Sequence, residues 1–358
     1  MNRLGRYVFK SVFGYVLITL LVLTSVFLFF DMIAELRDVG KEGYTLKNAL
    51  VYVALTLPSR LYQLLPVAVL IGSIFSLSGM ADTSQITVMR TAGVSILRLS
   101  GWMLICGVSY AVLTFLIGEF VAPMGSEAAK RYQVEAKQSV LLSKFRSGVW
   151  VKDGASIMNV SVMNPDMSLE GIRVYALADG AKLSHIFDAQ RATFESDKHW
   201  HLTGVKRTDF YDDKVTVTSL PKYIWQSEVN PDMLAVLMVK PQEMSVDALR
   251  SYIGHLETNK QSTLRYELAF WAKLFYPLAC ISMMLIALPF ALAQRRAGNV
   301  GVKIFLGILL GVTFNFASQL VTYVGELYAL PPMLAAGTPS LVLMSLAVFF
   351  LWRQERGG

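Results

Sequence analysis

The sequence predicts an α-helical membrane protein with an all-β domain inserted between its third and fourth spans. A membrane-spanning helix needs about 20 consecutive apolar residues, and the 358-residue chain supplies such segments six times. Three of them precede and three follow a polar stretch over residues 124–262. Within that stretch the apolar residues occur in short β-branched runs, which are typical of strands.

The composition supports residence in a membrane. The chain is 54% hydrophobic and has a mean hydropathy of +0.47, which is too apolar for a soluble enzyme. Its net charge of +7 comes from basic residues that flank the apolar segments on one side, so it indicates topology rather than nucleic-acid binding. Cys106 and Cys280 both lie in apolar segments, which excludes a disulfide framework in the insert.

The first three spans are predicted at Val12–Ile33, Leu50–Met80 and Leu97–Val121. Two prolines inside the second predict kinks, because a membrane helix tolerates proline when neighbours satisfy the freed carbonyls. Pro123 is expected to end the third span. The N-terminal apolar run is too long for a cleaved signal peptide, so we expect a retained helix.

The last three spans are predicted at Tyr266–Gln294, Val302–Glu326 and Met333–Trp352. Starting inside, six spans return both termini to the cytoplasm and leave the insert outside. We therefore expect a multi-pass membrane protein with three parts. They are an N-terminal transmembrane half (1–123), a β domain outside the membrane with a helical connector (124–262) and a C-terminal transmembrane half (263–358).

The insert is predicted to be an all-β sandwich or jelly roll, because turn residues separate its short runs of alternating apolar and polar residues. Ser245–Asn259 is expected to be a helical connector into the fourth span. The apolar residues of the insert either fill a closed core or line an open hydrophobic channel, and the pattern leaves both open. They are Val151, Ile157, Val160, Ile172, Val174, Phe187, Phe194, Val217 and Ile224. The turns are expected at 153–154, 164–166, 179–180, 196–197 and 212–213.

The chain lacks the motifs of a nucleotide-driven or hydrolytic enzyme. It contains no Gly-x-x-x-x-Gly-Lys-Ser/Thr loop to cradle ATP phosphates. It also shows no Ser-Lys, His-Glu or paired-Asp set at membrane depth, as an intramembrane hydrolase would require. If transport is active, its energy comes from a partner subunit or an ion gradient.

The loop between the second and third spans, residues 82–93, is the sharpest local feature. Asp82 is a candidate N-cap, and Gly93 is placed to stop the helix. Ile86, Met89 and Arg90 project from one side at i, i+3 and i+4. Such a helix either fills a groove in a cytoplasmic ATPase or simply anchors the loop at the membrane interface.

Several strings, in this order and spacing, resemble the LptF/LptG family of lipopolysaccharide-export permeases over essentially the whole chain. The Gly148–Gly154 and Arg265–Leu268 strings favour the LptG-like branch over the LptF-like paralogue, which stays the alternative. The matching strings are Arg6-Tyr7, Gly118-Glu119-Phe120-Val121-Ala122-Pro123, Gly148-Val149-Trp150-Val151-Lys152-Asp153-Gly154, Arg265-Tyr266-Glu267-Leu268, Trp271-Ala272-Lys273, Pro277 and Pro331-Pro332.

The resemblance implies a permease subunit of an ABC exporter that moves lipopolysaccharide from the outer leaflet of the inner membrane through its periplasmic jelly roll. Its implied partners are an LptF-like permease, a dimeric LptB-like ATPase, a single-span LptC-like subunit and a periplasmic bridge protein. ATP and Mg²⁺ would be bound by the ATPase, and this chain would hold no cofactor. A scaffolding or mechanotransmitting subunit that binds no lipid in its spans is the alternative from another class.

The resemblance also assigns residue roles. It makes the 82–93 helix the ATPase-coupling element, although Gln85 stands where the family commonly has a carboxylate. The implied coupling residues are Asp82, Ser84, Gln85, Ile86, Met89, Arg90 and Gly93.

A lipid A headgroup needs cations at headgroup depth, and the family's basic positions at the outer ends of spans one and three fall on Arg37 and Lys130. Two further family basic positions read Asp31 and Gln133, so this headgroup site would be less cationic. The implied substrate-binding residues are Arg37, Lys41, Lys130, Arg131 and Lys273. The alternative is that these side chains are charged residues at the membrane interface, solvated or snorkelling, with no role in binding substrate.

Glu119 and Lys273 are ionisable groups within apolar runs. Such groups are costly in a membrane and are usually paired or functional. We expect them to sit at similar depth, where they either pair, let Lys273 reach a substrate phosphate, or snorkel to the interface.

Overall fold

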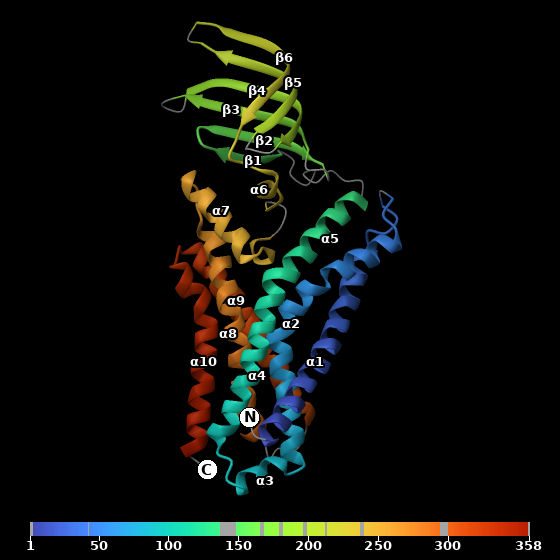
Figure 1. Cartoon of the computed structure of the whole chain (residues 1–358), viewed down its shortest axis with the longest axis vertical. Coiled ribbons are helices and arrows are strands. Elements are labelled where there is room, and N and C mark those ends of the chain that lie inside the picture. Colours follow the sequence, from blue (N-terminus) through green and yellow to red (C-terminus); the bar gives the residue numbers. More distant parts are fainter. Residues whose placement is uncertain are drawn as a thin grey trace.

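The computed structural model describes residues 3–41, 43–136, 148–164, 168–178, 182–195, 199–211, 213–236, 240–293 and 300–356. Figure 1 shows a bundle of long helices with the β domain above one end. The short helix α3 and both termini lie at the opposite end. The predicted turns at 165–166, 179–180, 196–197 and 212 and the loop at 294–299 lie outside the described residues.

Six helices are long and apolar enough to cross a membrane, as predicted from the sequence. Several extend well beyond their apolar cores, since the 34 residues of α1 span about 51 Å against a hydrocarbon thickness of about 30 Å. Their outer ends therefore stand clear of the bilayer core. The helices are α1 (Arg3–Leu36), α2 (Leu46–Asp82), α4 (Ile96–Leu116) with its continuations, α8 (Leu264–Ala293), α9 (Val300–Leu327) and α10 (Pro332–Arg356).

The third span does not end at Pro123, which corrects the prediction from the sequence. Helix α4 passes through a π-helical turn, η1 (Ile117–Val121), into α5 (Ala122–Ala136) without a break. In this turn the N–H of Ala122 bonds to the carbonyl of Ile117, five residues earlier. The wider turn shifts the hydrogen-bond pattern just before the proline, which has no N–H of its own to donate.

Helices α2 and α8 form the centre of the bundle, and α1 and α9 both pack on α2. Small residues permit the closest approaches. A Cβ on Gly72 of α2 would lie 2.5 Å from the Cα of Val16 on α1, and one on Gly311 of α9 would lie 2.9 Å from Val67 of α2. Gly307 of α9 faces Ile74 of α2. Gly307 and Gly311 therefore allow α9 to pack closely on α2.

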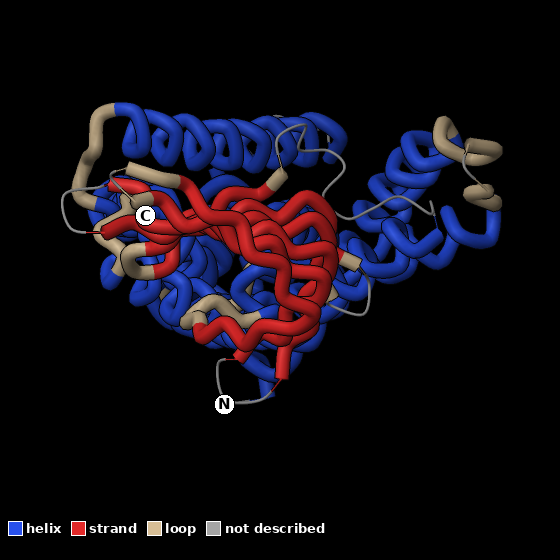
Figure 2. Tube along the Cα trace, turned by 90° about the horizontal axis from the view of Figure 1, so that it is seen from above, coloured by secondary structure: helices blue, strands red, loops and turns tan. Residues whose placement is uncertain are grey.

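The inserted domain is all-β, as predicted. Its strands form one antiparallel sheet in the order β1-β2-β3-β4-β5-β6, which Figure 2 shows strongly twisted above the helices. This is a meander, whereas a jelly roll consists of two Greek keys, so the strand order refines the predicted architecture. The strands are β1 (Val149–Asp153), β2 (Ser156–Met163), β3 (Leu169–Ala178), β4 (Lys182–Glu195), β5 (His199–Phe210) and β6 (Val215–Gln226).

Most of the apolar residues predicted for this domain join one cluster on one face of the sheet. Trp200 is fully buried there, and its indole N–H donates to the carbonyl of Val229 at 2.8 Å. Ile157 is half-buried and lies outside this cluster. Val217 and Ile224 on β6 are also exceptions, being 64% and 58% exposed. Their cross-strand partners are Thr208 and His201, whereas the alternate residues Leu220 and Tyr223 pair with Val205 and Leu202 of the cluster, so Val217 and Ile224 lie on the opposite face of the sheet.

The connector from the β domain to the fourth span is helical, as predicted. It comprises α6 (Pro231–Val236), the 3₁₀ turn η2 (Pro241–Glu243) and α7 (Val246–Thr258). Helix α7 runs antiparallel to the start of α8, and the rings of Tyr252 and Tyr266 lie 4.7 Å apart. The two helices form a hairpin between the bundle and the β domain (Figure 1).

The close approach of α1 and α2 gives a stability prediction. Gly72→Ala places a methyl group against backbone atoms of α1 that can move only if the helices separate, so we expect the free energy of unfolding to fall by about 1–3 kcal/mol. Gly79→Ala, on the same helix with nothing within 4 Å of the new Cβ, is the matched control and should be neutral or stabilising. Thermal unfolding of the purified protein in detergent measures both, and equal effects would contradict the packing described.

Candidate functional site

A short helix, α3 (Gln85–Thr91), lies at the end of the bundle opposite the β domain (Figure 1). Gly93 follows it with φ +85°, and the N–H groups of Gly93 and Val94 bond to the carbonyls of Arg90 and Met89 at 3.0 Å each. This is a Schellman motif, which requires the left-handed conformation that glycine adopts without strain. The predicted stop at Gly93 is confirmed.

The start of α3 differs from the prediction. Helix α2 continues to Asp82, two residues beyond the predicted end of the span, so Asp82 is not the N-cap. Ser84 takes that position with φ 61° and no capping bond from its side chain. Only Thr83 and Ser84 separate the two helices, and the left-handed backbone of Ser84 lets the chain turn from α2 into α3.

The two apolar residues predicted to contact an ATPase face the opposite way. Ile86 and Met89 are buried in the helix-bundle core, so they anchor α3 to this chain and are not presented to a partner. The outward face consists of Asp82, Ser84, Val88 and Arg90, all exposed, with Val88 at 64%. The i, i+3 spacing identified an apolar face correctly, but in a helix packed on its own bundle this face points inward.

Gln85 is held from within the chain. Its side-chain oxygen accepts a hydrogen bond of 3.0 Å from the hydroxyl of Tyr7, near the start of α1. The residue at the position where the family commonly has a carboxylate thus ties α3 to the first span.

At the other end of the bundle, Asp31 and Arg60 join α1 to α2. The Nε and Nη2 atoms of Arg60 each donate to one carboxylate oxygen of Asp31 at 2.6 Å, and Nη1 donates to Gln63 at 3.1 Å. Such two-point contacts are among the strongest in proteins. Arg60 is not among the site residues predicted from the sequence, although an arginine inside an apolar segment is itself a signal of function.

Glu35, one turn further out, connects three elements. Its Oε1 atom accepts hydrogen bonds from Tyr44 at 2.9 Å and from Gln133 at 2.8 Å. Burial and the contact with Glu35 raise the pKa of the Tyr44 hydroxyl well above its usual value, so this group stays protonated and remains a donor. We call Asp31, Arg60, Glu35, Tyr44 and Gln133 the outer polar network. It contains Asp31 and Gln133, the two positions at which the resemblance implies basic residues.

The predicted headgroup cations surround this network unequally. Arg37 is exposed at the end of α1, and Lys130 is half-buried one turn before Gln133 on α5. Lys41 pairs with Asp38 at 3.0 Å and Arg131 with Glu127 at 2.5 Å, both on the surface. The contact between Glu35 and Gln133 brings the outer ends of α1 and α5 together, and Lys130 lies on the joined face.

Lys273 lies apart from these cations. The residue is 7% exposed, and its ammonium donates to the backbone carbonyl of Met244, just before α7. Glu119, in the π-helical turn of the third span, accepts from the backbone N–H groups of Val246 and Asp247. Both ionisable groups therefore bind the segment that begins α7.

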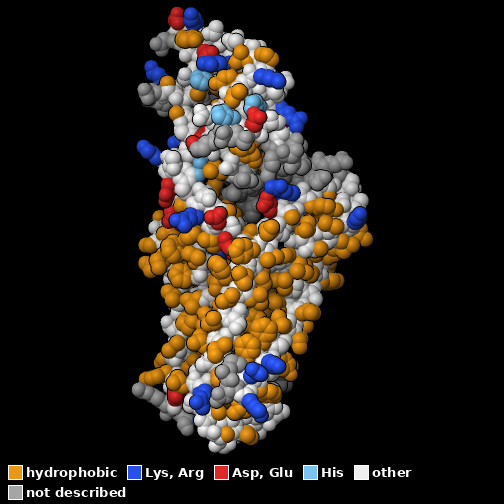
Figure 3. Space-filling model, in the orientation of Figure 1, with side chains coloured by type: hydrophobic (Ala, Val, Ile, Leu, Met, Phe, Trp, Pro, Cys, Tyr) orange, Lys and Arg blue, Asp and Glu red, His pale blue; other side chains and the backbone are white. Residues whose placement is uncertain are grey.

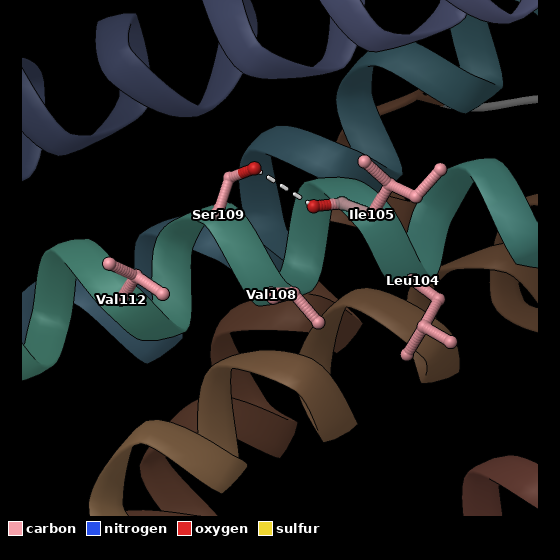
Figure 4. Close-up of a pocket in the computed structure, with 5 residues that line it drawn as sticks. All are labelled: Leu104, Ile105, Val108, Ser109 and Val112. Carbon is pink, nitrogen blue, oxygen red and sulfur yellow. Dashed lines mark hydrogen bonds between the residues drawn. The ribbon is translucent and has the colours of Figure 1, made fainter. Parts of the chain in front are cut away.

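The flank of α4 carries an apolar hollow (Figure 4). It is lined by Leu104, Ile105, Val108, Ser109 and Val112. The hydroxyl of Ser109 donates to the carbonyl of Ile105 at 2.9 Å, so it is already engaged within the helix. The hollow offers hydrocarbon contacts and no charge, which suits an acyl chain of the surrounding bilayer.

The surface agrees with a membrane-embedded bundle. Figure 3 shows a broad apolar belt over the visible face of the helices, with mainly Lys and Arg on the end that carries α3 and mixed charges on the end toward the β domain. Cations concentrate on the cytoplasmic side of membrane proteins.

The pair formed by Asp31 and Arg60 gives a second prediction. Asp31→Asn leaves the guanidinium without its carboxylate, so we expect a loss of about 1–3 kcal/mol in the free energy of unfolding. Exchanging the two residues (Asp31→Arg with Arg60→Asp) should recover most of this loss. Glu127→Gln, which breaks an exposed pair, is the control and should change stability by less than about 1 kcal/mol. Thermal unfolding in detergent is the measurement, and an exchange as unstable as the single variant would argue against the pair.

Comparison with known proteins supports one family. Residues 6–353 match the family model "Lipopolysaccharide export system permease LptF/LptG". The chain is 29% identical over 354 residues to the lipopolysaccharide export system permease protein LptG of Escherichia coli (strain K12), covering 98% of each chain. It is 28% identical over 356 residues to the protein of that name from Haemophilus influenzae, covering 99% of each. The chain therefore belongs to the LptF/LptG family of lipopolysaccharide export permeases.

Proposed function

We propose that this chain is the LptG-like permease half of an ABC exporter that extracts lipopolysaccharide from the outer leaflet of the inner membrane and passes it to its periplasmic β domain. The observation that carries the proposal is a six-span bundle, matched to this family over nearly its whole length, with a β domain at one end and α3 at the other. Both termini and α3 would be cytoplasmic, in keeping with the basic residues at that end.

The exposure of the spans supports a second permease subunit. Helices α1 and α9 are the least buried spans. In each, only 17% of the most apolar 18-residue stretch is buried inside the chain. They flank α2 and present large apolar side chains outward, including Phe29, Phe30 and Phe316. A cavity large enough for a lipid with several acyl chains would be closed by an LptF-like subunit facing this surface.

The outer polar network supports a headgroup site at the mouth of that cavity. Arg37 and Lys130 are cations near the outer ends of α1 and α5, and Arg60 lies further along α2, against Asp31 of α1. Arg60 shares its charge with Asp31, so a phosphate would compete with that carboxylate. Lys41 and Arg131 would add longer-range attraction from the surface.

The energy would come from a dimeric LptB-like ATPase that binds ATP and Mg²⁺, because this chain carries no phosphate-binding loop. It would dock on the outward face of α3. The anchoring of Ile86, Met89 and Gln85 within this chain would make α3 move as one body with α1 and α2. An LptC-like single-span subunit and a bridge protein would accept the lipid from the β domain.

Docking of the ATPase gives a third prediction. Val88→Glu introduces a charge on the outward face of α3, so we expect the ATPase to be lost from the complex when this chain is purified from membranes. Trp150→Glu, the same kind of change on an exposed residue of the β domain, is the control and should retain the ATPase. Retention by both variants would argue against docking at α3, and recovery of a homodimer alone would overturn the proposed complex.

Lipid binding gives a fourth prediction. A photoreactive residue at Phe30, exposed on α1, should crosslink to lipopolysaccharide in membranes, whereas one at Leu104 on the flank of α4 should crosslink mainly to phospholipid. Labelled lipopolysaccharide at Phe30 supports the permease. Its absence there would favour a scaffolding subunit that binds no lipid in its spans.

A further inference from the structure

Helix α7 is bound at both ends. Its base, the segment where it starts, lies against η1 of the third span and against α8, the fourth span, and Asn259, which follows its end, lies against the β domain. The 13 residues of α7 correspond to about 20 Å of rigid helix between these two contacts. Helix α7 is therefore placed to hold the β domain at a set orientation to the spans.

At the base, Glu119 completes the N-terminus of α7. Its Oε2 atom accepts from the N–H of Val246 at 2.8 Å and its Oε1 from the N–H of Asp247 at 3.4 Å. The hydroxyl of Ser245 accepts from the N–H of Ala248 at 3.1 Å. The first three free N–H groups of the helix are thus satisfied, and the negative charge also complements the helix dipole.

Lys273 of α8 binds the same segment. Its ammonium donates to the carbonyl of Met244, and both residues are buried. A buried lysine is costly without a nearby opposite charge, and the carboxylate of Glu119, bound to Val246 and Asp247, is such a charge. The start of α7 therefore binds one charged side chain from the third span and one from the fourth.

At the other end, Asn259 ties α7 to the first turn of the β domain. Its Oδ1 atom accepts from the N–H of Gly154 at 2.8 Å, and its backbone carbonyl accepts from Lys152 at 3.2 Å. Asn259 is 6% exposed. Gly154 has φ +57°, so the turn between β1 and β2 presents its N–H in a conformation that glycine favours.

The position of Glu119 links α7 to movement of the spans. It lies in the π-helical turn of the third span, and that span begins directly after α3. π-helical turns interrupt the regular hydrogen-bond ladder and frequently mark functional sites. A shift of the third span against the fourth would alter the spacing of Glu119 and Lys273 and so displace the base of α7.

We propose that Glu119 and Lys273 are positioning residues that hold the base of α7, so that movement of the third span against the fourth reorients the β domain to receive lipid. This inference rests on the proposed function. Helix α7 transmits the movement, with its base bound by the two charged side chains and Asn259, which follows its end, bonded to the β1–β2 turn.

The test separates lipid entry from lipid transfer in the assembled complex. Photoreactive residues are placed at Phe30 on α1 and at Ile157 on β2, in an otherwise unchanged chain and in the Glu119→Gln variant. We expect Glu119→Gln to keep lipopolysaccharide crosslinking at Phe30 and ATP hydrolysis, and to reduce crosslinking at Ile157 by about fivefold or more, as expected for coupled sites. Asp247→Asn, which removes a carboxylate from the same helix turn but keeps the backbone contacts, is the matched control.

A second variant covers the case in which Glu119→Gln fails to fold. Asn259→Ala removes the bond to Gly154 beyond the end of α7, away from the membrane, and should give the same selective loss at Ile157. Equal crosslinking at Ile157 in both folded variants would overturn the inference and leave the proposed function intact. Absence of crosslinking at Phe30 in the otherwise unchanged chain would instead overturn the proposed function.

Discussion

The low polarity of the bilayer core is the constraint on which the rest of the structure depends, because it offers no water to solvate a charge or an open hydrogen bond. Glu119 and Lys273 satisfy this constraint by binding the backbone of residues 244–247. Asp31 and Arg60 satisfy it by a two-point contact between helices. In each case a polar group near the membrane connects elements that are distant in the sequence.

The outer polar network joins three helices through charged and polar side chains. Asp31 of α1 is acidic, and Arg60 of α2 brings a positive charge to the same place. Gln133 binds Glu35 and closes α5 onto α1 without adding charge. In the headgroup site proposed above, part of the positive charge would therefore come from α2.

At each end of the bundle a short segment is anchored by residues of the spans. At one end α3 is anchored by buried Ile86 and Met89, and at the other the start of α7 is held by Glu119 and Lys273. The third span joins these ends, since α4 follows α3 and η1 carries Glu119.

The sequence by itself determined the number of spans, the inserted all-β domain, the helical connector and the family, because these follow from apolar length, periodicity and the order of local motifs. It also located α3 and its stop at Gly93, whose left-handed turn is a local requirement. Only the tertiary structure decided that Ile86 and Met89 face inward, that the helix continues through Pro123, and that Glu119, Lys273 and Arg60 have the partners they do. These outcomes depend on which helices pack together, and contacts between residues far apart in the chain leave no periodic signal in a single sequence.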